Sequence, residues 1–437
     1  SRAARMYFIF RQPFLKKPQL KKIKRRQTMK KVFSLIVLVS LVLGTLLSAG
    51  CAVRISAEDM TAGYTGRAGV GKDIDARFTS AVTDLAVRLF RASYSAGECG
   101  CISPLSLISA LAMCENGAAG NTLSQFEELF GLTREELNGY MYTYLNGITS
   151  SEKVKFNTAN SIWLRDNFIP TPAFLQSNAD YYSAAVYRSD FGRETVKEIN
   201  EWVRQNTDGI IKKTIDTIPK TAVFYLINAT VFDAEWATVY EKSMVSDGTF
   251  TSYSGERRTA RMMRSEESKY IFGDGVTGFM KYYSGGRYAL ATLLPETDID
   301  GFIAGLDGAT LRALISGAQG GIVRATMPRF SFQSDYEMCD ALSALGLTDA
   351  FSSDADFSVL GATKNGDPAY IASVIHKTDI TVDERGTRAG AVTVIRGDTA
   401  AADPSLARTV TLDRPFVFAI VDTETGFPVF MGAVTDV

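Results

Sequence analysis

The chain has 437 residues, of which 46% are hydrophobic, a content typical of a globular protein. Its first 50 residues hold 12 of the 47 Lys and Arg residues and no Asp or Glu. The remainder carries 35 basic and 48 acidic residues, a net charge of −13, which argues against a nucleic-acid partner because such binding needs a basic surface.

The N-terminal region has the pattern of an export signal. A positive start at Met29 is followed by an apolar run over residues 32–47 and by small residues ending at Cys51. The run is shorter than the ~20 residues of a membrane-spanning helix, the alternative interpretation. We therefore expect residues 1–28 to be an upstream extension, residues 29–50 a signal peptide, and the mature protein to be exported, either extracellular or on the cell surface.

Cys51 and the small residues before it resemble a bacterial lipobox, in which the cysteine is lipidated after cleavage. Ser48 departs from that pattern, which prefers an aliphatic residue there, so simple secretion remains the alternative. A lipid on Cys51 is the only membrane contact that we expect. Residues 51–72, rich in Gly, Ser and Thr, are predicted to be a flexible linker to a domain over residues 73–437.

The sequence contains no convincing cofactor or metal motif. Residues 66–72 have the spacing of a phosphate-binding loop, but Asp73 stands where Ser or Thr would bind magnesium, and no buried strand precedes them. With one histidine in the chain, the usual Cys/His metal clusters are not available. The cysteines also give no disulfide framework; they are Cys51, Cys99, Cys101, Cys114 and Cys339.

Hydrophobic periodicity predicts helices early in the domain and short strands late. Ser103 is the expected N-cap of the second helix, with Pro104 in its first turn. The predicted helices cover residues 73–94, 103–114, 123–130, 134–145, 194–206 and 335–345. The predicted strands cover residues 156–163, 222–232, 268–273, 278–283, 287–294, 321–332, 409–420 and 427–434. This order indicates an α+β fold around large sheets.

The segment from His376 to Ala402 combines the features of a strand and a loop. It begins with the period-two alternation of a strand, breaks at three charged residues, and then has small side chains at every second position. Those alternate positions are Thr387, Ala389, Ala391 and Thr393. We interpret the segment as an exposed loop that can also form a strand inside a crowded sheet.

Several motifs in sequence order resemble the serpin family, suicide inhibitors of serine and some cysteine proteases, over residues 74–437. They are residues 103–106 (SPLS), 156–160 (FNTAN), 199–203 (INEWV), 226–229 (LINA), 414–416 (RPF), 430–432 (FMG) and 384–393 (ERGTRAGAVT). The resemblance implies a fold of eight or nine helices around three β-sheets, with an exposed reactive-centre loop at about residues 384–408. A monomer that is not an enzyme is expected.

The family mechanism implies that a protease attacks the loop and is trapped when the loop inserts into the central sheet. The hinge would comprise Glu384, Gly386, Thr387, Ala389, Ala391 and Thr393. The family's spacing places the attacked bond at Ala400–Ala401, whose small side chains suit elastase-like or subtilisin-like serine proteases. The segment before Pro415 is about four residues longer than in the family pattern, so the bond has room to shift.

The resemblance also assigns residues that control sheet opening. Ser103, Ser106 and Asn228 would form a hydrogen-bonded cluster with His376, and Glu384 would pair with Arg329 near Trp236. The alternative for His376 and Trp236 is an ordinary place in the core.

Two other functions stay open. A serpin fold that no longer inhibits would act as a binding or adhesive surface protein, for which the Arg-Gly-Asp triplet at residues 396–398 is a weak signal. A hydrolase would pair His376 with Cys99, Cys101 or a serine.

Overall fold

The computed structural model describes residues 55–64, 66, 69–211, 213–219, 222–366, 369–387 and 407–437. These residues form nine α-helices and three β-sheets, which confirms the expected α+β architecture. Within these ranges no helix is long and apolar enough to cross a membrane.

Six of the nine described helices begin at a residue whose side chain caps the first turn. Ser103 accepts a hydrogen bond from the Ser106 amide at 3.3 Å and Pro104 lies in the first turn, as predicted. Asp75 caps the preceding helix by accepting from the Phe78 amide. The helices are α2 (Ala76–Ser93), α3 (Pro104–Glu115), α4 (Gly120–Phe130), α5 (Arg134–Gly147), α6 (Pro172–Tyr182), α7 (Arg193–Asn206), α8 (Ile299–Gly305), α9 (Gly308–Ser316) and α10 (Cys339–Ala344).

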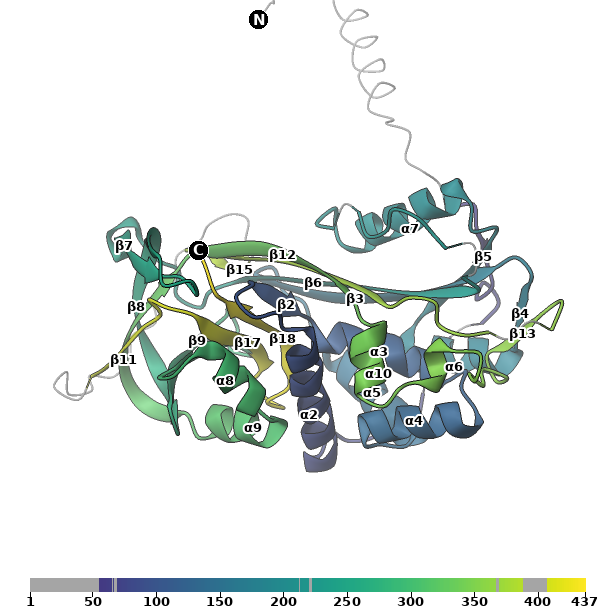
Figure 1. Cartoon of the computed structure of the whole chain (residues 1–437), viewed down its shortest axis with the longest axis horizontal. Helices are drawn as coiled ribbons and strands as arrows, with labels where there is room; N and C mark the ends of the chain where they lie inside the picture. The colour runs from purple at the N-terminus through teal and green to yellow at the C-terminus, as the bar shows by residue number, and fades with distance from the viewer. Residues whose placement is uncertain are drawn as a thin grey trace, which may run out of the picture. The chain divides into compact units, whose positions relative to one another are not determined.

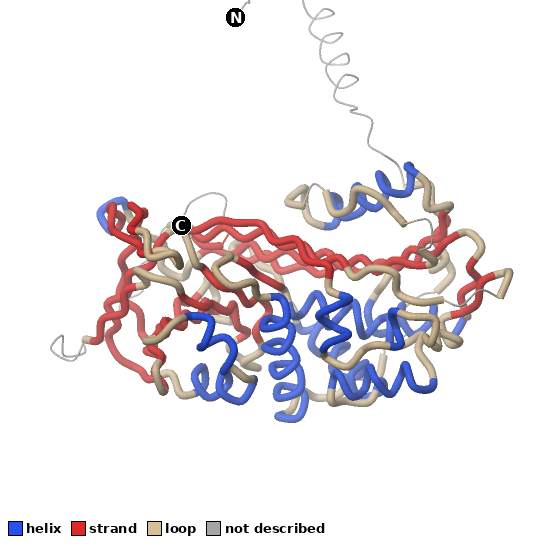
Figure 2. Tube along the Cα trace, viewed as in Figure 1, coloured by secondary structure: helices blue, strands red, loops and turns tan. Residues whose placement is uncertain are grey.

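A seven-stranded central sheet has the order β1-β5-β3-β6-β15-β14-β12. Its long pair β3 and β6 is antiparallel, with Asn160 opposite Asn228. The strands are β1 (Glu58–Asp59), β3 (Val154–Arg165), β5 (Ala185–Ser189), β6 (Phe224–Glu235), β12 (Phe330–Glu337), β14 (Ile375–Val382) and β15 (Gly386–Thr387). Figure 1 and Figure 2 show this sheet between α7 on one face and α3, α5 and α6 on the other.

The remaining strands form a nine-stranded sheet and a two-stranded sheet. The nine are β2 (Gly100–Ile102), β7 (Val245–Thr251), β8 (Arg257–Gly273), β9 (Val276–Tyr282), β10 (Tyr288–Pro295), β11 (Gln319–Pro328), β16 (Arg408–Thr411), β17 (Phe416–Asp422) and β18 (Pro428–Val434). The small sheet pairs β4 (Phe168–Pro170) with β13 (Gly361–Thr363).

Several predicted element boundaries were wrong. The strand expected at residues 268–273 is the end of β8, which begins eleven residues earlier at Arg257. The strand expected at residues 321–332 is two strands in different sheets, because the chain leaves β11 at Pro328 and enters β12 at Phe330. The strand expected at residues 409–420 divides before Pro415, which lacks the amide that a sheet ladder needs. The helix expected at residues 335–345 is only α10, since β12 continues to Glu337.

Part of the predicted linker belongs to the fold. Within β1, Glu58 pairs opposite Arg188 of β5, and their side chains form an ion pair of 2.6 Å. Ile55 and Ala57 pack against the hydrophobic residues beneath α7. The polar sequence of this stretch gave no strand signal because its pairing uses backbone groups, so the described fold starts at Ile55 and not at residue 73.

Two separate hydrophobic clusters hold the layers together. The larger one fills the space between the central sheet, the nine-stranded sheet and helices α2 to α6. The smaller one attaches α7 to the opposite face of the central sheet through Ile199, Trp202 and Val203, which pack on Trp163 and Tyr225. Because α7 is held by its own small cluster, its attachment is independent of the main core.

Candidate functional site

Two residues of the predicted hinge already form a strand within the central sheet. In β15, Gly386 pairs opposite Glu235 and Thr387 opposite Ala234 of β6, while Thr387 also pairs opposite Val382 of β14. The three strands therefore lie in the order β6-β15-β14. At this end of the sheet, an inserted strand separates β6 from β14.

Close packing explains the two residue types in β15. A Cβ atom on Gly386 would lie 1.9 Å from the carbonyl oxygen of Ala234, so any larger residue would force the strands apart. The Thr387 side chain is 3% exposed, and its hydroxyl lies 2.6 Å from the Tyr283 hydroxyl. A small residue and a hydrogen-bonded residue thus start the inserted strand.

A narrow slot continues from Thr387 between β6 and β14. We call this space the insertion slot; it is lined by Ile210, Ile211, Thr230, Val231, Phe232, Thr378, Asp379, Ile380, Thr387, Ile420 and Phe430. Its volume is about 20 Å³, on the scale of one water molecule. Across the described residues, β6 and β14 have no backbone pairing with each other. An entering strand would have to widen the slot, because paired strands lie about 4.8 Å apart.

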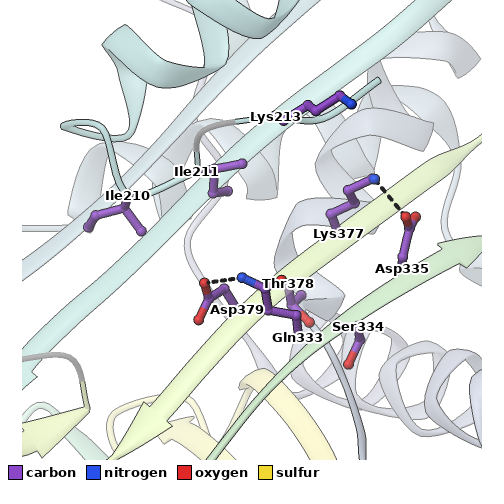
Figure 3. A pocket seen from close by; sticks show the side chains of 9 residues that line it. All are labelled: Ile210, Ile211, Lys213, Gln333, Ser334, Asp335, Lys377, Thr378 and Asp379. Atoms are coloured by element: carbon purple, nitrogen blue, oxygen red, sulfur yellow. Dashed lines mark hydrogen bonds and ion pairs between the residues drawn. The ribbon is translucent and has the colours of Figure 1, made fainter. Parts of the chain in front are cut away.

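The segment that follows α7 covers the outer side of the sheet next to the slot. Ile210, Ile211 and Lys213 lie over β12 and β14 and, with them, enclose a pocket of about 400 Å³ (Figure 3). On the floor, Lys377 pairs with Asp335 at 2.6 Å across the two strands. A strand that entered the slot would meet the two isoleucines first.

The predicted opening cluster lies at the junction of α3, β6 and β14. His376 is 4% exposed, and its Nε2 accepts a hydrogen bond of 2.9 Å from the Ser103 amide. Burial lowers the pKa of His376 to about 4, so the imidazole is neutral in the folded protein. The Ser103 hydroxyl donates to the Val429 carbonyl at 3.0 Å.

The other half of this cluster joins α3 to β6 and β3. The Ser106 hydroxyl donates to Asn228 Oδ1, which also accepts from the Thr230 hydroxyl at 2.8 Å. Asn228 Nδ2 then donates to Asn160 Oδ1 at 2.6 Å. The four predicted residues are thus close together but form two pairs, Ser103–His376 and Ser106–Asn228, linked through α3.

Just beyond the C-terminal end of β14, an exposed ion pair flanks the hinge. Arg329 Nε lies 2.7 Å from Glu384 Oε1, as the family resemblance led us to expect. Trp236 lies beside the pair, where its indole donates to the Asp383 carbonyl at 2.9 Å and its amide donates to the Arg385 carbonyl at 2.8 Å. Trp236 therefore fixes the turn that leads into β15.

Sequence reasoning missed a group of buried side chains next to the turn that leads into β15. The Tyr283 ring stacks on Trp236 with centroids 4.4 Å apart. Lys281, only 2% exposed, forms a 2.8 Å ion pair with Glu267 and lies over the Tyr240 ring. The sequence carried one usable signal, a lysine inside the apolar strand 276–282, which predicts a buried charge with a partner. Asn160, also missed, could be located only from its register opposite Asn228.

The geometry does not support a hydrolase. In the described part of the chain, the hydrogen bond of His376 is to a backbone amide and not to a hydroxyl or thiol. Cys101 is buried, and burial raises the pKa of its thiol well above the ordinary value. No group of Cys, His, Asp and Glu side chains with metal-binding geometry occurs in the residues that the structure describes.

Several predicted residues lie outside the described ranges. They are Cys51, Ala389, Ala391, Thr393, Ala400, Ala401 and residues 396–398.

The central sheet thus contains two residues of the predicted hinge, in β15 between β6 and β14, with a narrow slot beyond Thr387. The family model described as Serpin (serine protease inhibitor) matches residues 80–437, and the chain belongs to the serpin family. Members of this family are generally protease inhibitors and not catalytic enzymes.

Relatives and solved structures agree with this assignment. Neuroserpin of Homo sapiens is 28% identical over 378 residues, covering 81% of this chain and 90% of the relative. An uncharacterized serpin-like protein of Thermococcus kodakarensis is 28% identical over 343 residues, covering 76% and 79%. The thermophilic serpin tengpin in its native state has a TM-score of 0.83 at 42% identity, covering 87% of this chain and all of tengpin. For latent tengpin the TM-score is 0.75.

Proposed function

We propose that this chain is a suicide inhibitor of serine endopeptidases with elastase-like or subtilisin-like specificity. The protease attacks Ala400–Ala401 and forms an acyl-enzyme. The cleaved loop then enters the insertion slot behind Thr387 and carries the protease with it. The observation that supports this proposal most directly is β15, which places two hinge residues between β6 and β14.

The energy for this step comes from completing the central sheet. Each new backbone hydrogen bond contributes about 1 kcal/mol net, and an inserted strand would form roughly a dozen. No proline occurs between residues 384 and 403, so each inserted residue has an amide donor. In an inserted strand, the inward positions from Thr387 to Thr393 would turn small side chains toward the lining of the slot.

A test of inhibition uses the purified protein with subtilisin, pancreatic elastase and trypsin. We expect a complex that survives denaturing electrophoresis with the first two proteases, together with a C-terminal fragment that begins at Ala401. Cleavage without such a complex for all three proteases would instead favour a non-inhibitory surface protein. A fragment that begins elsewhere would relocate the bond and leave the mechanism standing.

We further propose that the protein is exported and anchored through a lipid on Cys51. The supporting observations are the small residues before Cys51 and the basic and apolar segments before them. Expression in a bacterial host with radiolabelled palmitate tests this proposal. Label should be incorporated by the wild type and lost in Cys51→Ser, and an unlabelled, fully secreted wild type would contradict it.

A further inference from the structure

Two aromatic rings stack on each other on β8, Phe272 exposed and Tyr270 partly buried. Tyr270 and Phe272 are two positions apart and lie on the same side of the strand. Their rings stack with centroids 5.9 Å apart and planes 7° apart. Phe272 is 48% exposed, one of four large hydrophobic side chains in the described ranges that remain exposed. An exposed aromatic ring that is held in place by stacking on a second ring is a feature of binding surfaces.

Arg408 completes this surface from another strand. Its guanidinium carbon lies 4.6 Å from the centroid of the Tyr270 ring. Arg408 begins β16 and pairs opposite Val323 of β11, the strand that lies between β16 and β8. The register of β11 shifts after Gly320, and Gly320 and Gly321 present no side chain over this stretch.

The position of Arg408 connects this surface to the reactive loop. Arg408 follows the proposed attacked bond by seven residues from Ala401, a stretch that spans at most about 25 Å. A protease of about 230 residues has a radius of gyration of about 17 Å. A compact protein of that size extends roughly 22 Å from its centre, and about 25 Å is the limit for a fully extended stretch, so a protease bound at Ala400–Ala401 can touch the side chains around Arg408.

We propose that Tyr270, Phe272 and Arg408 form a secondary docking surface for the target protease, an inference that rests on the proposed inhibitory function. The matching protease surface presents an apolar side chain bordered by a carboxylate. The stacked rings take the apolar group, and a guanidinium that stacks by its face retains in-plane N–H donors for the carboxylate. Tyrosine and arginine are the residue types most often found where binding energy concentrates.

Binding of the protease is measured separately from cleavage of the loop. Subtilisin and pancreatic elastase, each with its active-site serine replaced by alanine, are titrated against the wild type, Phe272→Ser and Arg408→Gln. The matched control is Ile169→Ser, which removes an equally exposed hydrophobic side chain (54%) on β4, in the two-stranded sheet and not on β8. Association rates with the active proteases, and the salt dependence of those rates, are measured on the same variants.

We expect the Kd for at least one inactive protease to rise about tenfold in Phe272→Ser, and the association rate of the same protease in its active form to fall about tenfold. Both values should stay unchanged in Ile169→Ser. Arg408→Gln should also reduce the salt dependence of association. Equal affinity of wild type and Phe272→Ser for both inactive proteases, or no affinity in either case, would overturn the docking surface. Inactive-protease binding that depends on Phe272, without covalent adducts from active protease, would overturn the inhibitory function and leave the surface standing.

Discussion

The hydroxyl groups of Tyr283 and Thr387 lie 2.6 Å apart, and both side chains are almost fully buried. This hydrogen bond joins β15, the start of the loop, to an aromatic group in which Trp236 stacks on Tyr283 and Phe232 contacts Tyr283 edge-on. The loop is therefore anchored in the sheet by a side chain as well as by its backbone.

Replacing Tyr283 with Phe should loosen the hinge. The Thr387 hydroxyl would be left buried without its partner, at a cost of about 1–3 kcal/mol. We expect a lower thermal midpoint and, because the hinge is less firmly seated when the loop is cleaved, more inhibitor consumed per protease trapped. Thermal unfolding and a titration of residual protease activity give the two values.

Tyr288→Phe is the matched control for this change. Tyr288 is equally buried, but its hydroxyl has no hydrogen-bond partner among the described residues. Its removal should leave both values unchanged or raise the thermal midpoint. Equal effects of the two substitutions would show that the Tyr283–Thr387 bond has no specific role.

The two ion pairs beside Trp236 should differ in strength. Arg329 and Glu384 have side chains 47% and 20% exposed, so Arg329→Gln should cost about 1 kcal/mol or less. Lys281 and Glu267 are 2% and 10% exposed, and Lys281→Gln leaves a buried carboxylate without its cation, at a cost of about 3–5 kcal/mol. Thermal midpoints at low and high salt compare them, and only the exposed pair should weaken with salt. A larger loss in Arg329→Gln than in Lys281→Gln would contradict this order.

His376 should make the protein less stable in acid. Its pKa is about 4 in the folded protein because burial disfavours the charged form, against 6.5 for an ordinary histidine. The unfolded chain therefore binds the proton first, and stability present above pH 6.5 is lost as the pH falls toward 4, up to roughly 3 kcal/mol. Because the chain has one histidine, a single imidazole signal in its NMR spectrum reports the titration. A midpoint near 6.5 in the folded protein would refute the buried position.

Glu115 should make the protein less stable as the pH rises, whereas His376 makes it less stable as the pH falls. It is fully buried, neither carboxylate oxygen has a partner in the described part of the chain, and burial raises its pKa well above the ordinary value. The folded state keeps the proton longer than the unfolded state, so stability declines as the pH rises above about 4.5. Glu115→Gln should raise the thermal midpoint at pH 8 and change it little at pH 4.5.

The exposed Glu128→Gln serves as the control for Glu115 and should change neither value. Between pH 4.5 and 6.5 the effects of Glu115 and His376 on stability oppose each other. The contribution of His376 to stability is therefore best measured in the Glu115→Gln background. A thermal midpoint at pH 8 that is lower in Glu115→Gln than in the wild type would show that the Glu115 carboxyl is not held neutral.

Local sequence patterns predicted the elements whose periodicity or caps are strong. Helix α3 with Ser103 and Pro104, and strand β6 with its continuous apolar run, lie where expected. The division of residues 321–332 was missed although the sequence carries two signals for it, Pro328 and a change of the apolar alternation from odd to even positions at Arg329. Which sheet each half joins depends on tertiary packing. Strand β1 was missed because its partner β5 lies more than 120 residues away.

The residues of the candidate site also divide into those that the sequence identified and those that it did not. Ser103, Asn228 and His376 were identified by family motifs, and the structure places them at one junction. Tyr283 and Lys281 belong to no such motif, and their contacts with Thr387 and Glu267 join distant parts of the chain. Hydrogen bonds of this kind depend on strand register, which a single sequence does not specify.

The separate attachment of α7 has a consequence for local unfolding. The small cluster under α7 shares no buried residue with the main core, so the free energy needed to undock this helix is a fraction of that for global unfolding. Backbone amides of α7 should therefore exchange with deuterium well before those of α3, every residue of which is buried. The covering segment with Ile210 and Ile211 follows directly from α7, so the part of the molecule that opens first is also the part that lies over the insertion slot.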